Sequence, residues 1–200
     1  RDSIQVKQLF NVTQTHESYD PNRMRVWQAD LVKDEITQII PEGGCDLLLI
    51  MFVLSAVNPQ NMDLFMQHAV EHEIVPCDNE GLKRGGVLLF RDYGRYDMAQ
   101  LRFKATRKIE DNLYARQDGT LAYFFDVGRR KGRMDADELD ALFRHHGLKK
   151  RKVDVIRRCI RNRKSGKEMH RVWIQAIYEK EWNVCLNDDC GIRNGGVVLL

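Results

Sequence analysis

One apolar run sets the architecture of this chain: Asp46-Leu47-Leu48-Leu49-Ile50-Met51-Phe52-Val53-Leu54-Ser55-Ala56-Val57. A nearly unbroken run of this length is typical of a strand that buries both faces in a parallel sheet. Apolar residues then recur at helical spacing to about His72, which predicts a helix covering the sheet. The pair Gly85-Gly86 is expected to break the chain before a second buried strand at residues 87–90. Strand, helix and strand in this order predict a parallel crossover unit.

Downstream segments predict one further helix and more strands. Asp135 and Glu138 match a capping box, and the apolar stripe after them ends at Gly147, so we expect a helix between these points. Alternation with period two predicts an antiparallel hairpin at the sheet edge, formed by residues 153–159 and 172–178. Two shorter strands are expected at residues 25–29, which end at Asp30, and at residues 121–125, which follow a hairpin turn at Asp118-Gly119.

Length and composition bound the class of protein. With 200 residues, 43% of them hydrophobic and 30% charged, the chain is long enough for one ordinary domain with a sizeable core. The formal charge of +3 is only mildly basic, so total charge does not establish nucleic-acid binding. The longest apolar run is shorter than the roughly 18 residues of a membrane span. No signal peptide opens the sequence, so we expect a soluble intracellular protein without a membrane partner.

The cysteines and histidines predict neither disulfides nor a metal site. The five cysteines are scattered and none has C-x-x-C spacing, so a reducing compartment fits best. The six histidines form no H-E-x-x-H pattern, and Ser55 lacks the G-x-S-x-G surroundings of a hydrolase nucleophile. Neither G-x-G-x-x-G nor a P-loop occurs, so if the fold is of the nucleotide-binding type, its glycine-rich loop is expected upstream of Arg1.

Polar residues end three successive apolar strands of the predicted sheet: Asp30, Ser55 and Asp92. In open parallel sheets ligands gather beyond the carboxyl ends of the strands, where a carboxylate can accept hydrogen bonds from a ligand amine or hydroxyl. Each of the three residues could instead cap the following helix or turn. Because all three fall in register, we expect a ligand crevice at this edge of the sheet.

The segment Phe90 to Lys104 follows the second strand directly and combines an acid, aromatic rings and four bases. This combination predicts a site for an anionic substrate that carries a flat ring. Tyr114, Arg116 and Phe124 would extend it into an aromatic and cationic wall, suited to stacking an unpaired base and holding its phosphates. Aromatic residues at strand spacing are more often part of a core, and that interpretation stays open here.

Five separated segments carry a family resemblance: Ile50–Val57, Leu82–Gly86, Phe90–Lys104, Asn112–Thr120 with Tyr123–Phe125, and Arg171–Gln175. In this order, and over most of residues 15–180, they closely resemble the eukaryotic tRNA N3-methylcytidine methyltransferases. The resemblance implies methyl transfer from S-adenosylmethionine to N3 of a cytidine in a tRNA anticodon loop. It also implies an α/β fold, a Rossmann-like class I methyltransferase sheet that is N-terminally incomplete and carries an antiparallel C-terminal hairpin.

The resemblance assigns the cofactor and the substrate to different groups of residues. Asp30 and Leu31 would lie at the adenine side of S-adenosylmethionine, and Met51 would line the cofactor pocket. Asp92 and Tyr93 would be the catalytic residues, facing the methyl group and the target base. The residues that would bind the tRNA substrate are Arg91, Tyr96, Arg116, Arg163 and Arg171.

The chemistry fits these residue types. Cytosine N3 has its own lone pair, so in-line attack on the sulfonium methyl needs alignment more than a strong base. Positive charge then develops on the ring, and the Asp92 carboxylate could stabilise it. The target base must also leave its stack to be reached, and Tyr93 or Tyr96 could support the extruded ring.

The chain also departs from the family pattern. The glycine-rich cofactor loop and the acid of the next strand would precede Arg1, so we expect a fragment. Residues 71–81 and 127–134 form longer connections than is usual in the family, and residues 181–200 match nothing in it. The sequence therefore predicts a partial methyltransferase domain over residues 1–180, followed by an unassigned tail that is expected to lie outside the fold.

Two alternative functions stay open beside methyl transfer to tRNA. The chain could be a catalytically inactive fragment that binds RNA or a partner, or a methyltransferase that acts on a small molecule or a protein. The expected partners are tRNA and an accessory protein such as an aminoacyl-tRNA synthetase. The expected location is the cytoplasm, with a nuclear or mitochondrial pool left open.

Overall fold

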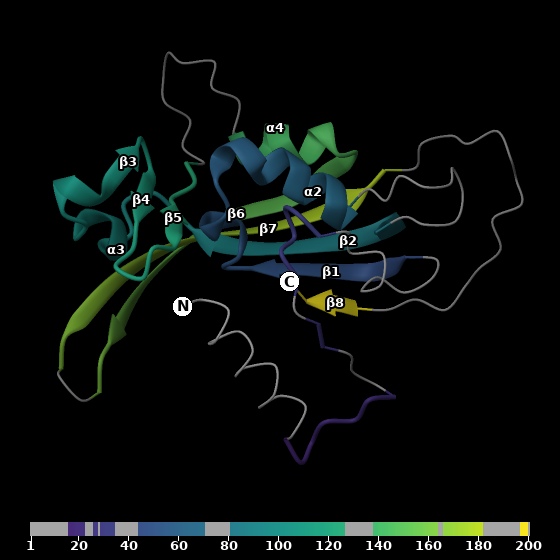
Figure 1. The fold of residues 1–200 in the computed structure, drawn as a ribbon, viewed down its shortest axis with the longest axis horizontal. Coiled ribbons are helices and arrows are strands. Elements are labelled where there is room, and N and C mark those ends of the chain that lie inside the picture. Colours follow the sequence, from purple (N-terminus) through teal and green to yellow (C-terminus); the bar gives the residue numbers. More distant parts are fainter. Residues whose placement is uncertain are drawn as a thin grey trace, which may run out of the picture.

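A five-stranded sheet organises most of the protein. The computed structural model describes residues 16–22, 26–27, 29–34, 44–70, 81–126, 138–163, 166–181 and 197–199. The sheet has the strand order β6-β7-β2-β1-β8, and a smaller sheet of order β3-β4-β5 lies at one end of it (Figure 1). The strands of the large sheet are Cys45–Met51 (β1), Leu82–Tyr93 (β2), Leu148–Arg161 (β6), Glu168–Lys180 (β7) and Val197–Leu199 (β8).

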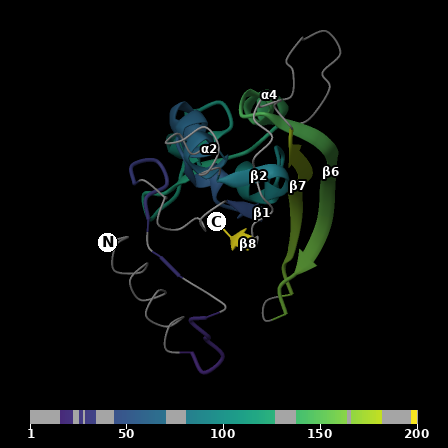
Figure 2. The same cartoon turned by 90° about the vertical axis from the view of Figure 1, so that its right-hand side faces the viewer.

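The predicted crossover unit is confirmed. β1 and β2 are parallel neighbours, with Ile50 opposite Phe90, and α2 (Met62–Val70) lies between them in the sequence. A second helix, α4 (Glu138–His145), lies on the same face of the sheet as α2 (Figures 1 and 2). The two helices and this face of the sheet share one core, which includes Leu48, Ile50, Phe65, Leu88, Phe90, Leu139, Phe143 and Tyr178.

The glycine pair in front of the second strand does not break the chain, so that prediction is wrong. β2 begins at Leu82 and runs through Gly85 and Gly86. Gly85 has φ +74°, and a Cβ atom on Gly86 would lie 2.7 Å from the Lys83 carbonyl oxygen. The β1–β2 register shifts at the same place, between Cys45 and Leu47. The glycines therefore allow an irregularity inside a continuous strand.

The predicted strand at residues 25–29 is also wrong for the residues of it that the structure describes. Val26, Trp27 and Ala29 are not in a strand, while Arg25 and Gln28 lie outside the described residues. A strand needs a neighbour that pairs its backbone. β8 occupies the place beside β1, where it pairs in parallel with Leu47 to Leu49.

β8 also corrects the prediction for the C-terminal tail. Val197 to Leu199 belong to the large sheet, so these three residues do not lie outside the fold. A strand of three residues is too short to show a period in the sequence. The division of the chain at residue 180 stays a prediction. The unusually long connections predicted at residues 71–81 and 127–134 fall almost entirely outside the described residues.

The predicted C-terminal hairpin is confirmed and is longer than expected. β6 and β7 pair in antiparallel register from Leu148 opposite Lys180 to Arg161 opposite Glu168. β7 pairs with β2 only as far as Trp173, which lies opposite Tyr93. Residues 157–163 and 166–172 therefore continue as a two-stranded ribbon beyond the carboxyl end of β2 (Figure 1). We call these residues the ribbon.

The smaller sheet contains the predicted hairpin. β4 (Leu113–Ala115) pairs with β5 (Leu121–Tyr123) around a turn in which Gly119 has φ +91°, and β3 (Lys108–Glu110) adds the third strand. The short helix α3 (Met98–Leu101) precedes this sheet. The predicted helix ending at Gly147 is confirmed as α4, although its expected cap, Asp135, lies outside the described residues. Among the helices described, none is both long and apolar enough to cross a membrane.

Candidate functional site

Asp92 lies near the carboxyl end of β2 and is completely buried. Its Oδ2 atom accepts a hydrogen bond of 2.9 Å from the Ser55 amide, and its Oδ1 atom accepts one of 2.8 Å from the Tyr93 amide. Ser55 belongs to the short 3-10 helix Leu54–Ala56 that follows β1. The carboxylate thus joins the carboxyl ends of two parallel strands, so two of the three strand-end residues predicted from the sequence meet.

The environment of Asp92 moves the pKa of its carboxyl group toward neutral pH. Burial raises the pKa of Asp92 to about 6, although hydrogen bonding by Ser55 and Tyr93 and the charge of Arg116 act in the opposite direction. The side chain is therefore mostly anionic at neutral pH, while its carboxylate has lost most of its water. Buried groups with perturbed titration are found preferentially at functional sites, although structural networks also produce them.

Aromatic rings and guanidinium groups surround Tyr93, the next residue along β2. Its ring centroid lies 5.1 Å from that of Phe52 and 5.8 Å from that of Phe124. The guanidinium carbons of Arg116 and Arg171 lie 5.7 and 5.5 Å from the same centroid. Three residues that the sequence placed at the site, from three separate segments, therefore converge at one point.

Arg91 adds a third guanidinium on the same face of the sheet. Its Nε and Nη2 atoms donate to Oε1 of Gln175, with an Nε–Oε1 distance of 3.1 Å, and its guanidinium carbon lies 5.7 Å from the Trp173 ring. Met51, the last residue of β1, lies opposite Arg91 and is 38% exposed. The predicted cofactor residue Met51 is therefore next to a predicted substrate residue.

A buried carboxylate that the sequence did not single out positions Arg171. Asp97 is fully buried, and its Oδ2 atom accepts hydrogen bonds from Arg171 Nε at 2.9 Å and from the Val172 amide at 2.8 Å. Its Oδ1 atom caps α3 by accepting from the Ala99 amide at 2.8 Å. Nearby, the Gly94 amide donates to the Val172 carbonyl at 2.8 Å, an approach that leaves little room for a Cβ atom. Asp97 therefore fixes the ribbon to the end of β2.

Phe52 is a second residue that sequence reasoning missed. It directly follows β1 with φ +59°, in the left-handed region that a bulky side chain rarely adopts. Its ring packs against Tyr93 and, at 5.8 Å, against Trp173, and its amide donates to the Arg91 carbonyl at 2.8 Å. Backbone strain of this kind costs about 1–3 kcal/mol and clusters at functional sites. No sequence pattern signals it, because the surrounding contacts impose the conformation.

Asp30 and Leu31 lie in a turn of their own. Asp30 Oδ1 accepts from the Val32 amide at 3.2 Å, and Asp30 Oδ2 forms an ion pair of 2.9 Å with Lys33. The Leu31 carbonyl lies 3.0 Å from Nδ1 of His68 on α2. Within the described residues, no hydrogen bond or ion pair joins this turn to Asp92 or Met51. The assignment of Asp30 and Leu31 to the cofactor stays a prediction.

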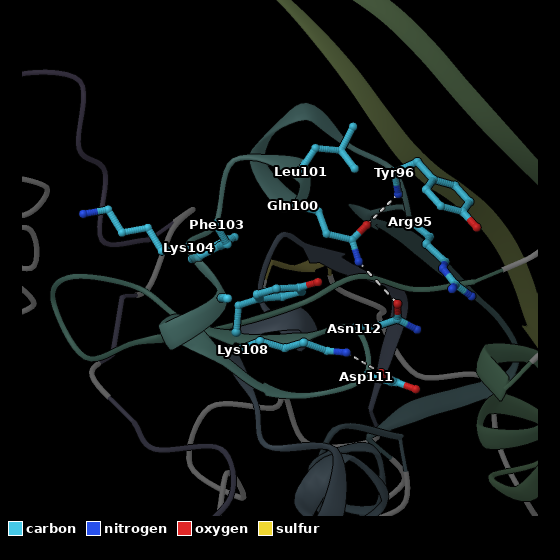
Figure 3. Close-up of a pocket in the computed structure, with 11 residues that line it drawn as sticks. Arg95, Tyr96, Gln100, Leu101, Phe103, Lys104, Lys108, Asp111 and Asn112 are labelled. Carbon is cyan, nitrogen blue, oxygen red and sulfur yellow. Dashed lines mark hydrogen bonds and ion pairs between the residues drawn. The ribbon is translucent and has the colours of Figure 1, made fainter.

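Within the described residues, neither Tyr96 nor Arg163 forms a hydrogen bond or ion pair with Asp92. Tyr96 lines an open pocket between α3 and the small sheet (Figure 3), and Arg163 is exposed near the tip of the ribbon. The ribbon also brings together the exposed side chains of Cys159, Glu168 and His170, whose potential ligand atoms lie within 4.8 Å of one another. Their sequence spacing did not indicate this group, because pairing across two strands brings it together.

The sequence has named relatives along most of its length. No protein-family model matches it. It is 42% identical over 171 residues, 86% of the chain, to tRNA N(3)-cytidine methyltransferase METTL2B of Homo sapiens, of which it covers 40%. It is 38% identical over 162 residues, 81% of the chain, to tRNA N(3)-cytidine methyltransferase METTL6 of Homo sapiens, of which it covers 51%. The chain therefore spans about half or less of these relatives.

Two solved structures share the fold at a TM-score of 0.50. One is a SAM-dependent methyltransferase from Methanosarcina mazei, with 14% identity, covering 78% of this chain and 66% of that one. The other is TehB from Haemophilus influenzae, with 11% identity, covering 88% of this chain and 47% of that one. These similarities confirm the predicted Rossmann-like α/β class of fold.

Proposed function

Because the chain belongs to the tRNA N(3)-cytidine methyltransferase family, of whose members it spans about half or less, we propose that it methylates tRNA. The reaction is methyl transfer from S-adenosylmethionine to N3 of a cytidine in the anticodon loop. The observation that carries this proposal is the buried Asp92 carboxylate, held by two backbone amides at the carboxyl ends of β1 and β2.

Asp92 and Tyr93 are the catalytic residues in this proposal. Methylation at N3 makes the cytosine ring cationic, and a carboxylate that already lies in a dry, fixed position stabilises developing positive charge without reorganising. Tyr93 supports one edge of the target base, while the guanidinium groups of Arg116 and Arg171 beside its ring hold the neighbouring phosphate groups. Asp97 is a positioning residue, because it acts through Arg171.

The residues at this edge fit S-adenosylmethionine as the cofactor. Trp173 Nε1 is buried without a hydrogen-bond partner within the described part of the chain, and a bound polar ligand would satisfy such an atom. Met51, opposite Arg91 at the end of β1, offers a partly exposed apolar contact. Asp30 and Leu31 are proposed for the adenine side. The cofactor supplies an electrophilic methyl group, and these residues orient it.

The ribbon is proposed to contact the tRNA backbone. It extends beyond the carboxyl end of β2, which is the same end at which Asp92 lies. It carries exposed basic side chains at Arg157, Arg158, Arg161, Arg163 and Lys167. Arginine and lysine contacts with phosphates fix the register of a nucleic acid without reading its sequence. The ribbon would thus hold the tRNA while the target base enters the site.

The proposal includes partners and location, which rest on the family relationship alone. An accessory protein such as an aminoacyl-tRNA synthetase would help to select the tRNA. The cytoplasm would be the main location, with a nuclear or mitochondrial pool left open.

Methyl transfer from labelled S-adenosylmethionine to tRNA tests the function, with nucleoside mass spectrometry to identify N3-methylcytidine. We expect transfer by the wild-type chain and a rate about 100- to 1,000-fold lower for Asp92→Asn, the scale on which removing one electrostatic group acts. Arg144→Gln is the matched control, because Arg144 is exposed on α4 and away from the site. Unchanged transfer by Asp92→Asn with retained cofactor binding contradicts the role of Asp92.

A binding measurement on the same protein preparation distinguishes an active methyltransferase from a catalytically inactive fragment. That alternative is favoured by the limited part of the relatives that the chain spans. Equilibrium binding of S-adenosylmethionine to the purified chain decides between the two: binding supports the enzyme, whereas tRNA binding without cofactor binding supports the fragment.

A further inference from the structure

An open pocket of about 390 Å³ lies between α3 and the small sheet (Figure 3), and Asp92 is not among the residues that line it. Its size is within the range of small-ligand sites, which is roughly 300–1,000 Å³. Aromatic, basic and amide side chains line it, among them Arg95, Tyr96, Gln100, Phe103, Lys104 and Tyr114. This combination of flat rings and positive charge is chemically suited to a nucleotide.

A buried amide builds one wall of this pocket. Gln100 is 8% exposed, and its Oε1 atom accepts a hydrogen bond of 2.6 Å from the Tyr96 amide (Figure 3). Its Nε2 atom donates to Oδ1 of Asn112 at 3.3 Å. Tyr96 has φ +66°, and its side chain is 62% exposed. The structure thus holds Tyr96 in a strained, left-handed backbone conformation that leaves its aromatic ring exposed at the pocket rim, where it can stack on a ligand.

A row of aromatic rings connects the pocket to the catalytic edge. Phe103 and Tyr114 stack with centroids 4.8 Å apart and an interplanar angle of 24°. Tyr114 lies 5.7 Å from Phe124, and Phe124 lies 5.8 Å from Tyr93. Because Tyr114 itself lines the pocket, the pocket is two ring contacts from Tyr93, close enough for one RNA strand to reach both places.

Positive charge lies at the rim of the pocket. Arg95 places its guanidinium 5.1 Å from the Tyr96 ring and pairs with Asp126 at 2.7 Å. Lys104 is exposed and points away from the stacked rings into solvent (Figure 3). Lys108 forms an ion pair of 2.6 Å with Asp111. The structure shows no carboxylate partner for Lys104 within the described residues, so its charge is available to a phosphate outside the pocket.

We propose that this pocket binds a second, unpaired nucleotide of the RNA substrate, close in the strand to the methylated base. The exposed face of Tyr96 stacks on the nucleobase and Arg95 beside it contacts its phosphate, while Lys104, on the other side of the pocket, contacts a different phosphate of the same strand. Stacking on aromatic rings tolerates any base, so the pocket selects an unpaired strand rather than a sequence. The inference rests on the proposed function. It assigns Tyr96 to a neighbouring nucleotide instead of the target base.

Binding of a short, labelled single-stranded oligoribonucleotide, measured by fluorescence anisotropy, tests the proposal. The variant Tyr96→Asn removes the ring, and asparagine tolerates the left-handed backbone. Lys104→Gln removes the exposed charge without disturbing the fold, and Arg144→Gln, an exposed residue on α4 that does not line the pocket, is the control. We expect binding weaker by roughly 5- to 100-fold for Tyr96→Asn, the loss of one base–aromatic stack, and unchanged binding for Arg144→Gln.

Two outcomes separate a failure of this inference from a failure of the proposed function. If the wild-type chain binds RNA and both pocket variants bind it equally well, the pocket is not a nucleotide site, while the proposed function stands. If the wild-type chain binds no RNA, both fail. Photo-crosslinking of thiouridine-substituted RNA gives an independent readout: crosslinks within residues 95–114 support the pocket, and crosslinks confined to the ribbon contradict it.

Discussion

At the scale of single residues, burying the Asp92 carboxylate lowers the free energy of unfolding at neutral pH but keeps a charged group out of water at the proposed site. The pKa of its carboxyl is about 6 in the folded protein, against a value of 3.8 for an unperturbed aspartate, because burial disfavours the anion. The folded state therefore holds its proton to a higher pH than the unfolded state. The contribution of Asp92 to stability is greatest below about pH 4 and declines as pH rises through 6, by up to about 3 kcal/mol.

This linkage predicts a pH-dependent difference between the wild type and Asp92→Asn. Urea unfolding at several pH values gives the free energy of unfolding of each protein, and the difference between them cancels most other titrating groups. We expect the wild type to lose up to about 3 kcal/mol relative to the variant between about pH 4 and pH 7. A difference that stays constant over this range would show that the carboxyl is not buried as described.

At the scale of elements, Asp97 is the main polar link between the ribbon and the end of β2. Its carboxylate is fully buried and accepts hydrogen bonds from Arg171, from the Val172 amide on β7 and from the Ala99 amide in α3. Removing the charge leaves Arg171 without its partner and loosens the position of its guanidinium beside Tyr93. Replacing Asp97 should therefore affect both the stability of the fold and the site, because its hydrogen bond to Arg171 contributes to both.

For Asp97→Asn we expect a loss of about 1–3 kcal/mol in the free energy of unfolding, the usual cost of weakening a buried charge-assisted hydrogen bond. We also expect weaker tRNA binding, since Arg171 is a proposed phosphate contact. Urea unfolding and tRNA binding measured on the same preparations check both effects. Arg144→Gln removes an exposed guanidinium whose partner, Asp140, keeps its ion pair with Lys150, so it should change neither by more than a few tenths of a kcal/mol.

At the scale of the whole molecule, the hydrophobic core and the proposed binding surface lie in different parts of the protein. The helices α2 and α4 cover one face of the sheet and share its core, while the ribbon and the small sheet lie beyond the carboxyl end of β2 (Figures 1 and 2). The exposed arginines of the ribbon therefore contribute little to the core. Their charge is available for an anionic partner.

We expect the affinity for tRNA to fall with salt concentration, and replacing Arg157, Arg158 and Arg163 by glutamine should make this dependence shallower. Each lost phosphate contact reduces the slope of log K against log salt by roughly 0.7–0.9, because fewer counterions are released. Titrations at several salt concentrations measure the slope. An unchanged slope in the triple variant, with its fold intact by circular dichroism, would remove the ribbon from the tRNA interface.

Local patterns in the sequence were enough for the parallel strand pair, its crossover helix, the β4–β5 turn, α4 and the C-terminal hairpin. Each of these elements has a period, a turn or a terminating glycine within a few residues of itself. The strand-end rule also placed Ser55 and Asp92 together, because parallel neighbours bring their carboxyl ends to one edge. The polar character of this edge of the sheet could thus be predicted from the sequence.

Local sequence patterns could not predict the contacts between segments that are far apart in the chain. The Arg171–Asp97 pair, the convergence of Arg116 and Arg171 on Tyr93, the left-handed Phe52 and the pairing of β8 with β1 all depend on segments far apart in the sequence. The same reason explains the failed strand at residues 25–29: propensity is local, whereas a strand exists only where a neighbour pairs with it. Tertiary structure alone decided which charges, rings and strands meet.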